Sequence, residues 1–118
     1  MKELFERLEI LKSTDAITEN AHIICHKTID AYVSQTEAAN YQMLITHLAM
    51  AVTRMERNEP LNAPPPSIMK EIYNSPNLEE AQRRVKWIEI ECRITIPREE
   101  KEFLYMHFVA ALTAKREE

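Results

Sequence analysis

The chain of 118 residues contains no glycine, although glycine makes up about 7% of an average protein. The phosphate-binding GxxxxGK[ST] loop and the GxGxxG turn of dinucleotide-binding folds both require glycine, so both are excluded. The two-residue turns that join antiparallel strands also favour glycine. The composition therefore disfavours an all-β fold and excludes the common nucleotide-binding α/β folds.

Cysteine is rare, and acidic residues outnumber basic ones. Cys25 and Cys92 stand alone without a CxxC spacing, and we expect buried free thiols in a reducing cytoplasm. The 15 Lys and Arg against 19 Asp and Glu give a net charge of −4. Nucleic-acid binders are usually basic because they neutralise phosphates, so direct nucleic-acid binding is not expected.

No apolar segment has the length of a membrane span. The most apolar stretch, Phe103 to Leu112, is about half a span and contains a histidine. The N-terminal MKELFERLEI mixes charges and has no apolar signal core. We therefore expect a cytoplasmic protein with no membrane partner.

Helical periodicity is what the sequence does contain. Apolar residues recur at three- and four-residue spacing, and proline provides the stop signals in Asn58-Glu-Pro60 and Asn62-Ala-Pro-Pro-Pro66. Ser34 with Glu37 matches a capping box, and Asn77 is expected to cap a later helix. The predicted helices are 2–12, 16–33, 34–57, 67–73, 78–93 and 97–116. The proline linker is too short to separate two domains, so the pattern predicts one all-α domain over residues 1–118.

Two predicted helices carry more apolar surface than one core face needs. The last helix is apolar almost all round, and helix 78–93 has a second apolar stripe of Trp87, Ile90 and Ile94 opposite its first. The second stripe needs a neighbour, and we expect a self-association surface.

His47 and Arg54 lie two turns apart along one edge of the third predicted helix. An imidazole at the border between core and surface, with a guanidinium on the same track, suits an anion such as phosphate. The spacing alone is also compatible with a different interpretation, in which His47 is a residue at the core boundary, Arg54 is a solvated charge and neither binds an anion.

His107 lies in the apolar last helix, two turns after Glu100 on nearly the same track. The Glu100 carboxylate could hold one ring nitrogen and leave the other as a nucleophile. The alternative is an ordinary core histidine whose hydrogen bonds are satisfied.

His22 and His26 are spaced four residues apart, as in some metal sites. No third ligand lies nearby, so a polar helix edge is the favoured interpretation, and we predict no metal or other cofactor. The sequence also lacks a GxSxG elbow or any nucleophile with a paired base, so we do not expect an enzyme.

Two signatures in order resemble a known family. Thr46-His-Leu-Ala-Met-Ala-Val-Thr-Arg54 resembles the His-Leu…Arg signature of the phosphotransferase-system (PTS) regulation domain, the PRD, and Asn58-Glu-Pro60 resembles the Gly-Glu-Pro that ends that helix. Ile94-Thr-Ile-Pro97-Arg-Glu-Glu, followed by Phe103-Leu-Tyr-Met-His107-Phe108, resembles the second signature. The resemblance covers about residues 16–115, and the two histidines lie at about the family's separation.

The resemblance implies a five-helix bundle, here with an extra short N-terminal helix, that usually forms homodimers. Domains of this family occur in bacterial antiterminators of the BglG and LicT type and in related activators, and are phosphorylated on histidine by phospho-HPr or a sugar-specific enzyme IIB. The resemblance therefore implies phosphorylation at His47 and His107, with Arg54 at a family position, whereas Glu100 is our own geometric suggestion.

The chain departs from the family in several places. We expect a single, stand-alone domain of this type without an effector domain, which would act on a separate transcription regulator. Asn58 replaces the usual glycine, and Arg98 stands where an acid is common. The alternative function is a structural or interaction bundle that kept the fold and lost phosphorylation.

Overall fold

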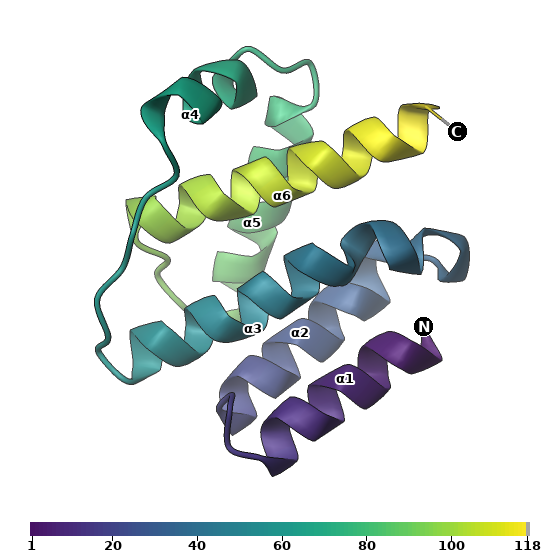
Figure 1. Ribbon diagram of the computed structural model, residues 1–118, viewed down its shortest axis with the longest axis vertical. Helices are drawn as coiled ribbons and strands as arrows, with labels where there is room; N and C mark the ends of the chain where they lie inside the picture. The colour runs from purple at the N-terminus through teal and green to yellow at the C-terminus, as the bar shows by residue number, and fades with distance from the viewer. Residues whose placement is uncertain (118) are drawn as a thin grey trace. The chain divides into compact units, whose positions relative to one another are not determined.

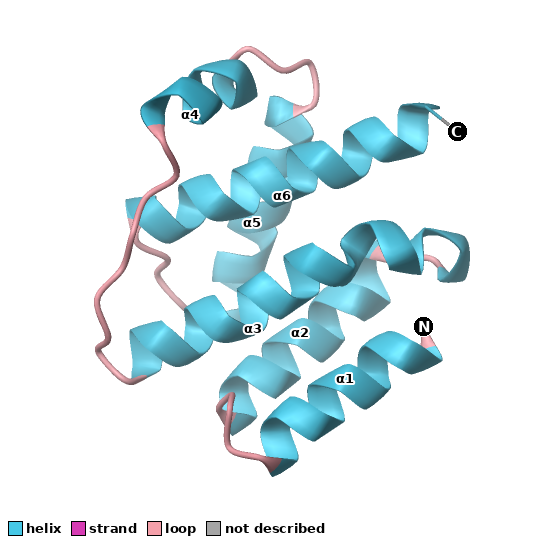
Figure 2. Cartoon of the chain, viewed as in Figure 1, coloured by secondary structure: helices cyan, strands magenta, loops and turns pink. Residues whose placement is uncertain are grey.

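The computed structural model describes residues 1–117, with side chains through residue 115. It contains six α-helices and one 3-10 helix within that range, and no residue there lies in a strand (Figure 2). The elements in order are α1 (Lys2–Ser13), α2 (Glu19–Tyr32), η1 (Gln35–Tyr41), α3 (Gln42–Glu56), α4 (Pro66–Tyr73), α5 (Leu78–Cys92) and α6 (Arg98–Glu117) (Figure 1). The all-α prediction is confirmed.

The chain divides into two compact units, Met1–Pro60 and residues 61–118. In the first unit α2 packs on α3, and α1 packs on both. Its core contains Tyr41, which is 1% exposed, and aliphatic side chains that are 0–2% exposed, each of which stabilises the fold by about 1.5–3 kcal/mol through burial. The largest of these aliphatic side chains are Leu4, Leu8, Ile17, Ile24, Ile29, Leu44, Ile45 and Leu48.

The buried Thr53 of α3 forms a hydrogen bond with the N-cap residue of α2. The N-cap of α2 is Thr18, whose hydroxyl accepts a hydrogen bond from the Ala21 amide at 3.2 Å. The Thr18 amide in turn donates to the hydroxyl of Thr53 at 3.1 Å, and that hydroxyl donates to the Ala49 carbonyl at 2.8 Å. Thr53 is 2% exposed, so its hydroxyl replaces water for the Thr18 amide.

Thr53→Val, which keeps the shape but removes the hydroxyl, is expected to lower the free energy of unfolding by about 1–3 kcal/mol, because the Thr18 amide loses its acceptor. Urea unfolding measures the loss. The exposed Thr95→Val is the control and should change stability by less than about 0.5 kcal/mol. Equal stabilities for the two variants would contradict this role of Thr53.

The start of the third predicted helix differs from the prediction. Residues 35–41 form the 3-10 helix η1, and Ser34 makes no side-chain cap bond to the backbone. The Ser34 hydroxyl instead donates to the Glu37 carboxylate at 2.7 Å, and the Glu37 amide donates to the Ser34 carbonyl at 3.0 Å. The two side chains satisfy each other, and the three-residue backbone bond favours the tighter helix over a capping box.

In the second unit α4 and α5 both pack against α6. Asn77 precedes α5 as predicted, but its side chain does not cap that helix. The Asn77 amide group donates to the hydroxyl of Thr113 in α6 at 3.1 Å, and the residue is buried. Asn77 therefore fastens the start of α5 to α6, a tertiary contact that local sequence does not reveal.

Left-handed backbone occurs at three residues that are not glycine. Asp15, Asn58 and Arg93 have φ of 61°, 55° and 55°. Each is followed by an amide that bonds to the carbonyl five residues before it: Ala16 to Leu11, Glu59 to Arg54 and Ile94 to Glu89. This is the Schellman ending, which normally uses glycine because a Cβ is unfavourable there. Asn58 thus adopts a left-handed conformation, which glycine would adopt without penalty.

Arg93→Gly is expected to raise the free energy of unfolding by about 1 kcal/mol, because arginine tolerates left-handed backbone poorly. Asn58→Gly should give a smaller gain, since asparagine adopts this conformation more readily. Thermal or urea unfolding measures both. Glu91→Gly, inside α5, is the control and should destabilise by about 1 kcal/mol. A loss of stability in Arg93→Gly would contradict the argument.

Candidate functional site

His47 lies on α3, directly before the fully buried Leu48, and its ring is half-buried. Arg54 lies two turns further along the same helix, about 10 Å in rise, and is half-buried as well. The helix therefore presents the imidazole at the border of the first unit's core, with the guanidinium on the same edge. This placement agrees with the periodicity of the sequence.

His107 lies on α6 in the second unit and is also half-buried. Glu100, two turns earlier on α6, is only 1% exposed and lies in the helix's first turn, where the helix dipole favours a negative charge. About 10 Å of helix rise separates the two residues. Glu100 is thus a buried carboxylate rather than a surface group, and burial of a carboxylate is costly unless the charge is compensated.

His22 and His26 lie against α1 rather than along an open polar edge of α2. Nε2 of His22 lies 3.3 Å from a carboxylate oxygen of Glu9 in α1, but without hydrogen-bond geometry, and the His22 side chain is 13% exposed. The His26 ring lies 4.8 Å from that of His22 and 4.5 Å from that of Phe5. The two histidines pack α1 onto α2. Among the side chains described, those of residues 1–115, no cluster of three or more His, Cys, Asp or Glu is arranged to hold a metal ion.

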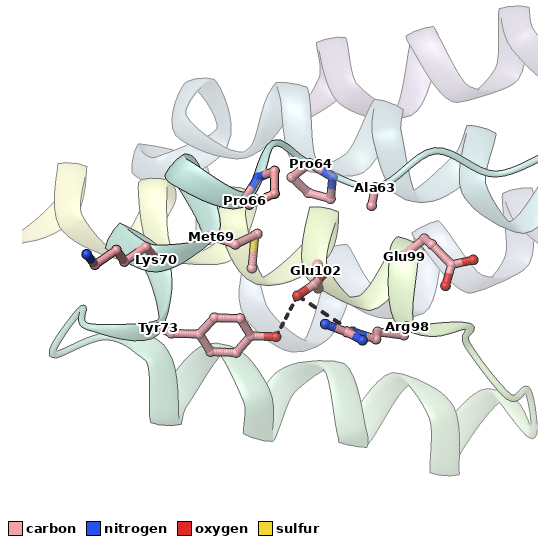
Figure 3. Close-up of a pocket in the computed structure, with 9 residues that line it drawn as sticks. All are labelled: Ala63, Pro64, Pro66, Met69, Lys70, Tyr73, Arg98, Glu99 and Glu102. Carbon is pink, nitrogen blue, oxygen red and sulfur yellow. Dashed lines mark hydrogen bonds and ion pairs between the residues drawn. The ribbon is translucent and has the colours of Figure 1, made fainter.

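A pocket of about 470 Å³ lies in the second unit, between the segment before α4, α4 itself and the first turns of α6 (Figure 3). Glu102 lies at its centre and is 6% exposed. The Tyr73 hydroxyl donates to Oε2 of Glu102 at 2.8 Å, and Nε of Arg98 lies 3.9 Å from the same oxygen. Partial burial and then the bond to Glu102 raise the pKa of Tyr73.

Sequence reasoning missed this pocket because its walls come from segments that are far apart in the chain. Residues 63–73 provide one side, and Arg98, Glu99 and Glu102 provide the other. The only local signal is the proline run, in which Pro64 and Pro66 line the pocket. Proline stiffens that segment, because its ring fixes φ.

The sequence model of the PRD domain matches residues 20–111. The chain belongs to the PRD family. The match includes His47 and His107, and α1 lies ahead of it. The same comparisons found no match among curated proteins or solved structures.

The helices described for this PRD include none that combines the length and the apolar character needed to cross a membrane. Even α6, which the sequence shows to be rich in apolar residues, begins with Arg98, Glu99 and Glu100.

Alkaline pH is expected to destabilise this PRD in part through Tyr73. A tyrosine whose pKa is raised in the folded chain holds its proton more tightly there. Its contribution to stability is therefore present below about pH 10 and is lost as the pH rises through the raised pKa. Urea unfolding between about pH 9 and pH 11 should show a shallower loss of stability in Tyr73→Phe than in the wild type. Parallel curves would contradict this.

Proposed function

We propose that this PRD is a regulatory module that accepts a phosphoryl group on His47 or His107. The donor is phospho-HPr or a sugar-specific enzyme IIB, and both act in the cytoplasm. The phosphorylated module then modulates transcription, or another protein, through dimerisation or protein binding. The observation that carries the proposal is the family match over residues 20–111, which contains both histidines.

The partial exposure of both histidines supports this proposal. A phosphocarrier must bring its phosphohistidine into contact with the acceptor nitrogen, and a completely buried imidazole would be out of reach. His47 and His107 are half-buried, each beside a fully buried residue, Leu48 and Phe108 respectively. The neighbouring core side chain limits the movement of the helix segment that carries the ring. Such positioning is most of what phosphoryl transfer requires of the acceptor.

The phosphoryl transfer needs no reactant other than the phosphohistidine of the donor. A lone pair on a neutral imidazole nitrogen of His47 or His107 attacks phosphorus in line. A new nitrogen–phosphorus bond forms, the nitrogen–phosphorus bond of the donor breaks, and its electron pair returns to the donor imidazole. The acceptor loses the proton on its other ring nitrogen and the donor imidazole takes up a proton, so both rings end neutral. We assign Arg54 to stabilise the charge of the phosphoryl group near His47, since a guanidinium binds phosphate oxygens through a planar fork. For His107, we propose that the Glu100 carboxylate holds one ring nitrogen and leaves the other as the nucleophile.

A phosphoryl group adds about two negative charges at the border of a helix. One to three charge-assisted hydrogen bonds, or repulsion from a carboxylate, then change the relative stability of two packing states. A difference of about 2–3 kcal/mol shifts such an equilibrium by about 30- to 150-fold. We propose that the equilibrium includes dimerisation, for which α5 offers the exposed Ile90, 67% accessible and flanked by Trp87 and Ile94.

In this proposal α2 to α6 correspond to the five helices of the PRD bundle, and α1 is the additional N-terminal helix. The 118 residues act as one regulatory domain, and a separate transcription regulator is the target.

The experiment is label transfer to the purified chain. The protein is incubated with radiolabelled phosphoenolpyruvate, enzyme I and HPr, with and without candidate enzymes IIB. We expect acid-labile, alkali-stable label on this chain that requires HPr or an enzyme IIB. Absence of label, while a known acceptor is labelled in the same mixture, would favour an interaction bundle that has lost phosphorylation.

A further inference from the structure

The pocket around Glu102 has a polar centre within apolar walls. The Tyr73 ring, Met69 and the rings of Pro64 and Pro66 supply the walls (Figure 3). Its volume of about 470 Å³ lies within the range of about 300–1,000 Å³ that is usual for small-ligand sites. A few convergent polar groups among apolar walls are the usual composition of such a site.

Glu102, which lines this pocket, has unused hydrogen-bonding capacity. Oε2 accepts the bond from Tyr73 and lies near Arg98. Oε1 makes no hydrogen bond in the described part of the chain, and it is not sealed from solvent. Arg98 is 84% exposed in its side chain, and only its Nε approaches Glu102, so its other N–H groups can donate to a ligand. The centre thus offers acceptors and donors side by side.

The charges that line the pocket cancel. Lys70 and Arg98 contribute two positive charges, and Glu99 and Glu102 contribute two negative ones. An anion would meet the buried Glu102 carboxylate, whose desolvation makes repulsion stronger. A cation would meet the guanidinium of Arg98 and the ammonium of Lys70. The arrangement therefore favours a ligand without net charge that has both hydrogen-bond donors and acceptors.

We propose that this pocket binds a neutral, polyhydroxylated small molecule of the size of a mono- or disaccharide. Its hydroxyl groups donate to Oε1 of Glu102 and accept from Arg98, while its C–H face packs on the Tyr73 ring and Met69. The inference does not depend on phosphorylation of either histidine.

The test is titration of the unphosphorylated full chain with neutral and charged sugars, in which isothermal calorimetry and saturation-transfer NMR measure binding. The neutral probes are glucose, fructose, mannose, sorbitol and cellobiose, and the charged probes are glucosamine and glucose 6-phosphate. We expect saturable binding of at least one neutral probe in the millimolar range, and weaker binding of its charged counterparts. Glu102→Gln should weaken binding at least about tenfold, because a bond to a charged acceptor is lost.

Tyr73→Phe keeps the aromatic wall but removes the hydroxyl that holds the Glu102 carboxylate in place, so it should weaken binding by about three- to tenfold. Glu91→Gln, an exposed acid of α5 outside the pocket, is the matched control and should bind like the wild type. No saturable binding of any neutral probe at tens of millimolar would overturn the proposal. So would binding that neither pocket variant alters, or tighter binding of a charged probe.

Discussion

The double variant His47→Ala/His107→Ala is expected to accept no phosphoryl group above background when it is incubated with enzyme I, HPr, enzyme IIB and phosphoenolpyruvate. Alanine has no nucleophilic nitrogen, so the attack on the donor's phosphohistidine cannot occur. The two single variants show which ring accepts: label persists in the variant that retains the acceptor. Acid-labile label on the intact protein is the measurement.

His26→Gln is the matched control for these variants. It removes an imidazole of the α1–α2 contact, and it should accept phosphate like the wild type. Circular dichroism must show the same helix content in all variants, so that loss of label reports chemistry rather than unfolding. Full labelling of the folded double variant would contradict the assignment of both acceptors.

Phe108→Ala is expected to lower the free energy of unfolding by about 3–5 kcal/mol. Phe108 is 0% exposed in α6, and the guanidinium carbon of Arg84 in α5 lies 5.8 Å from its ring centre. The substitution removes buried apolar surface, leaves a cavity and abolishes this cation–π contact. Because α6 also carries His107, we expect weakened packing to disturb the position of that imidazole as well.

Urea unfolding tests this expectation, with Met43→Ala as the control. Met43 is 72% exposed on α3, and its truncation should change stability by less than about 0.5 kcal/mol. A loss below about 1 kcal/mol for Phe108→Ala would show that the second unit does not depend on this side chain.

Most of the helices could be predicted from sequence because apolar periodicity and proline stops are local signals. The contacts that determine the ends of helices were less predictable. Asn77 looks like a cap but binds Thr113, a residue 36 positions away. Ser34 and Glu37 match a capping box, yet bond to each other and start a 3-10 helix. Both differences arise because a short polar side chain has several possible partners, and the fold selects among them.

Some residues of the candidate site could likewise be predicted from the sequence, and others could not. His47 and His107 stand out through motifs that are contiguous in sequence, and their half-buried positions follow from helix periodicity. The contact between α1 and α2, in which His22 lies near Glu9 and His26 lies near Phe5, depends on how α1 packs on α2. No local sequence pattern specifies that packing. The pocket around Glu102 was also unpredictable, because its residues come from segments about 25 positions or more apart that meet only through the packing of α4 on α6.

The most direct test of the central claim is mass-spectrometric mapping of phosphohistidine after transfer from phospho-HPr or enzyme IIB, with peptides kept at alkaline pH to preserve the phosphoryl group. The account predicts phosphate on the peptide that contains His47, on the peptide that contains His107, or on both. Phosphate found only on His22 or His26, or on no histidine while the donor is fully phosphorylated, would contradict it.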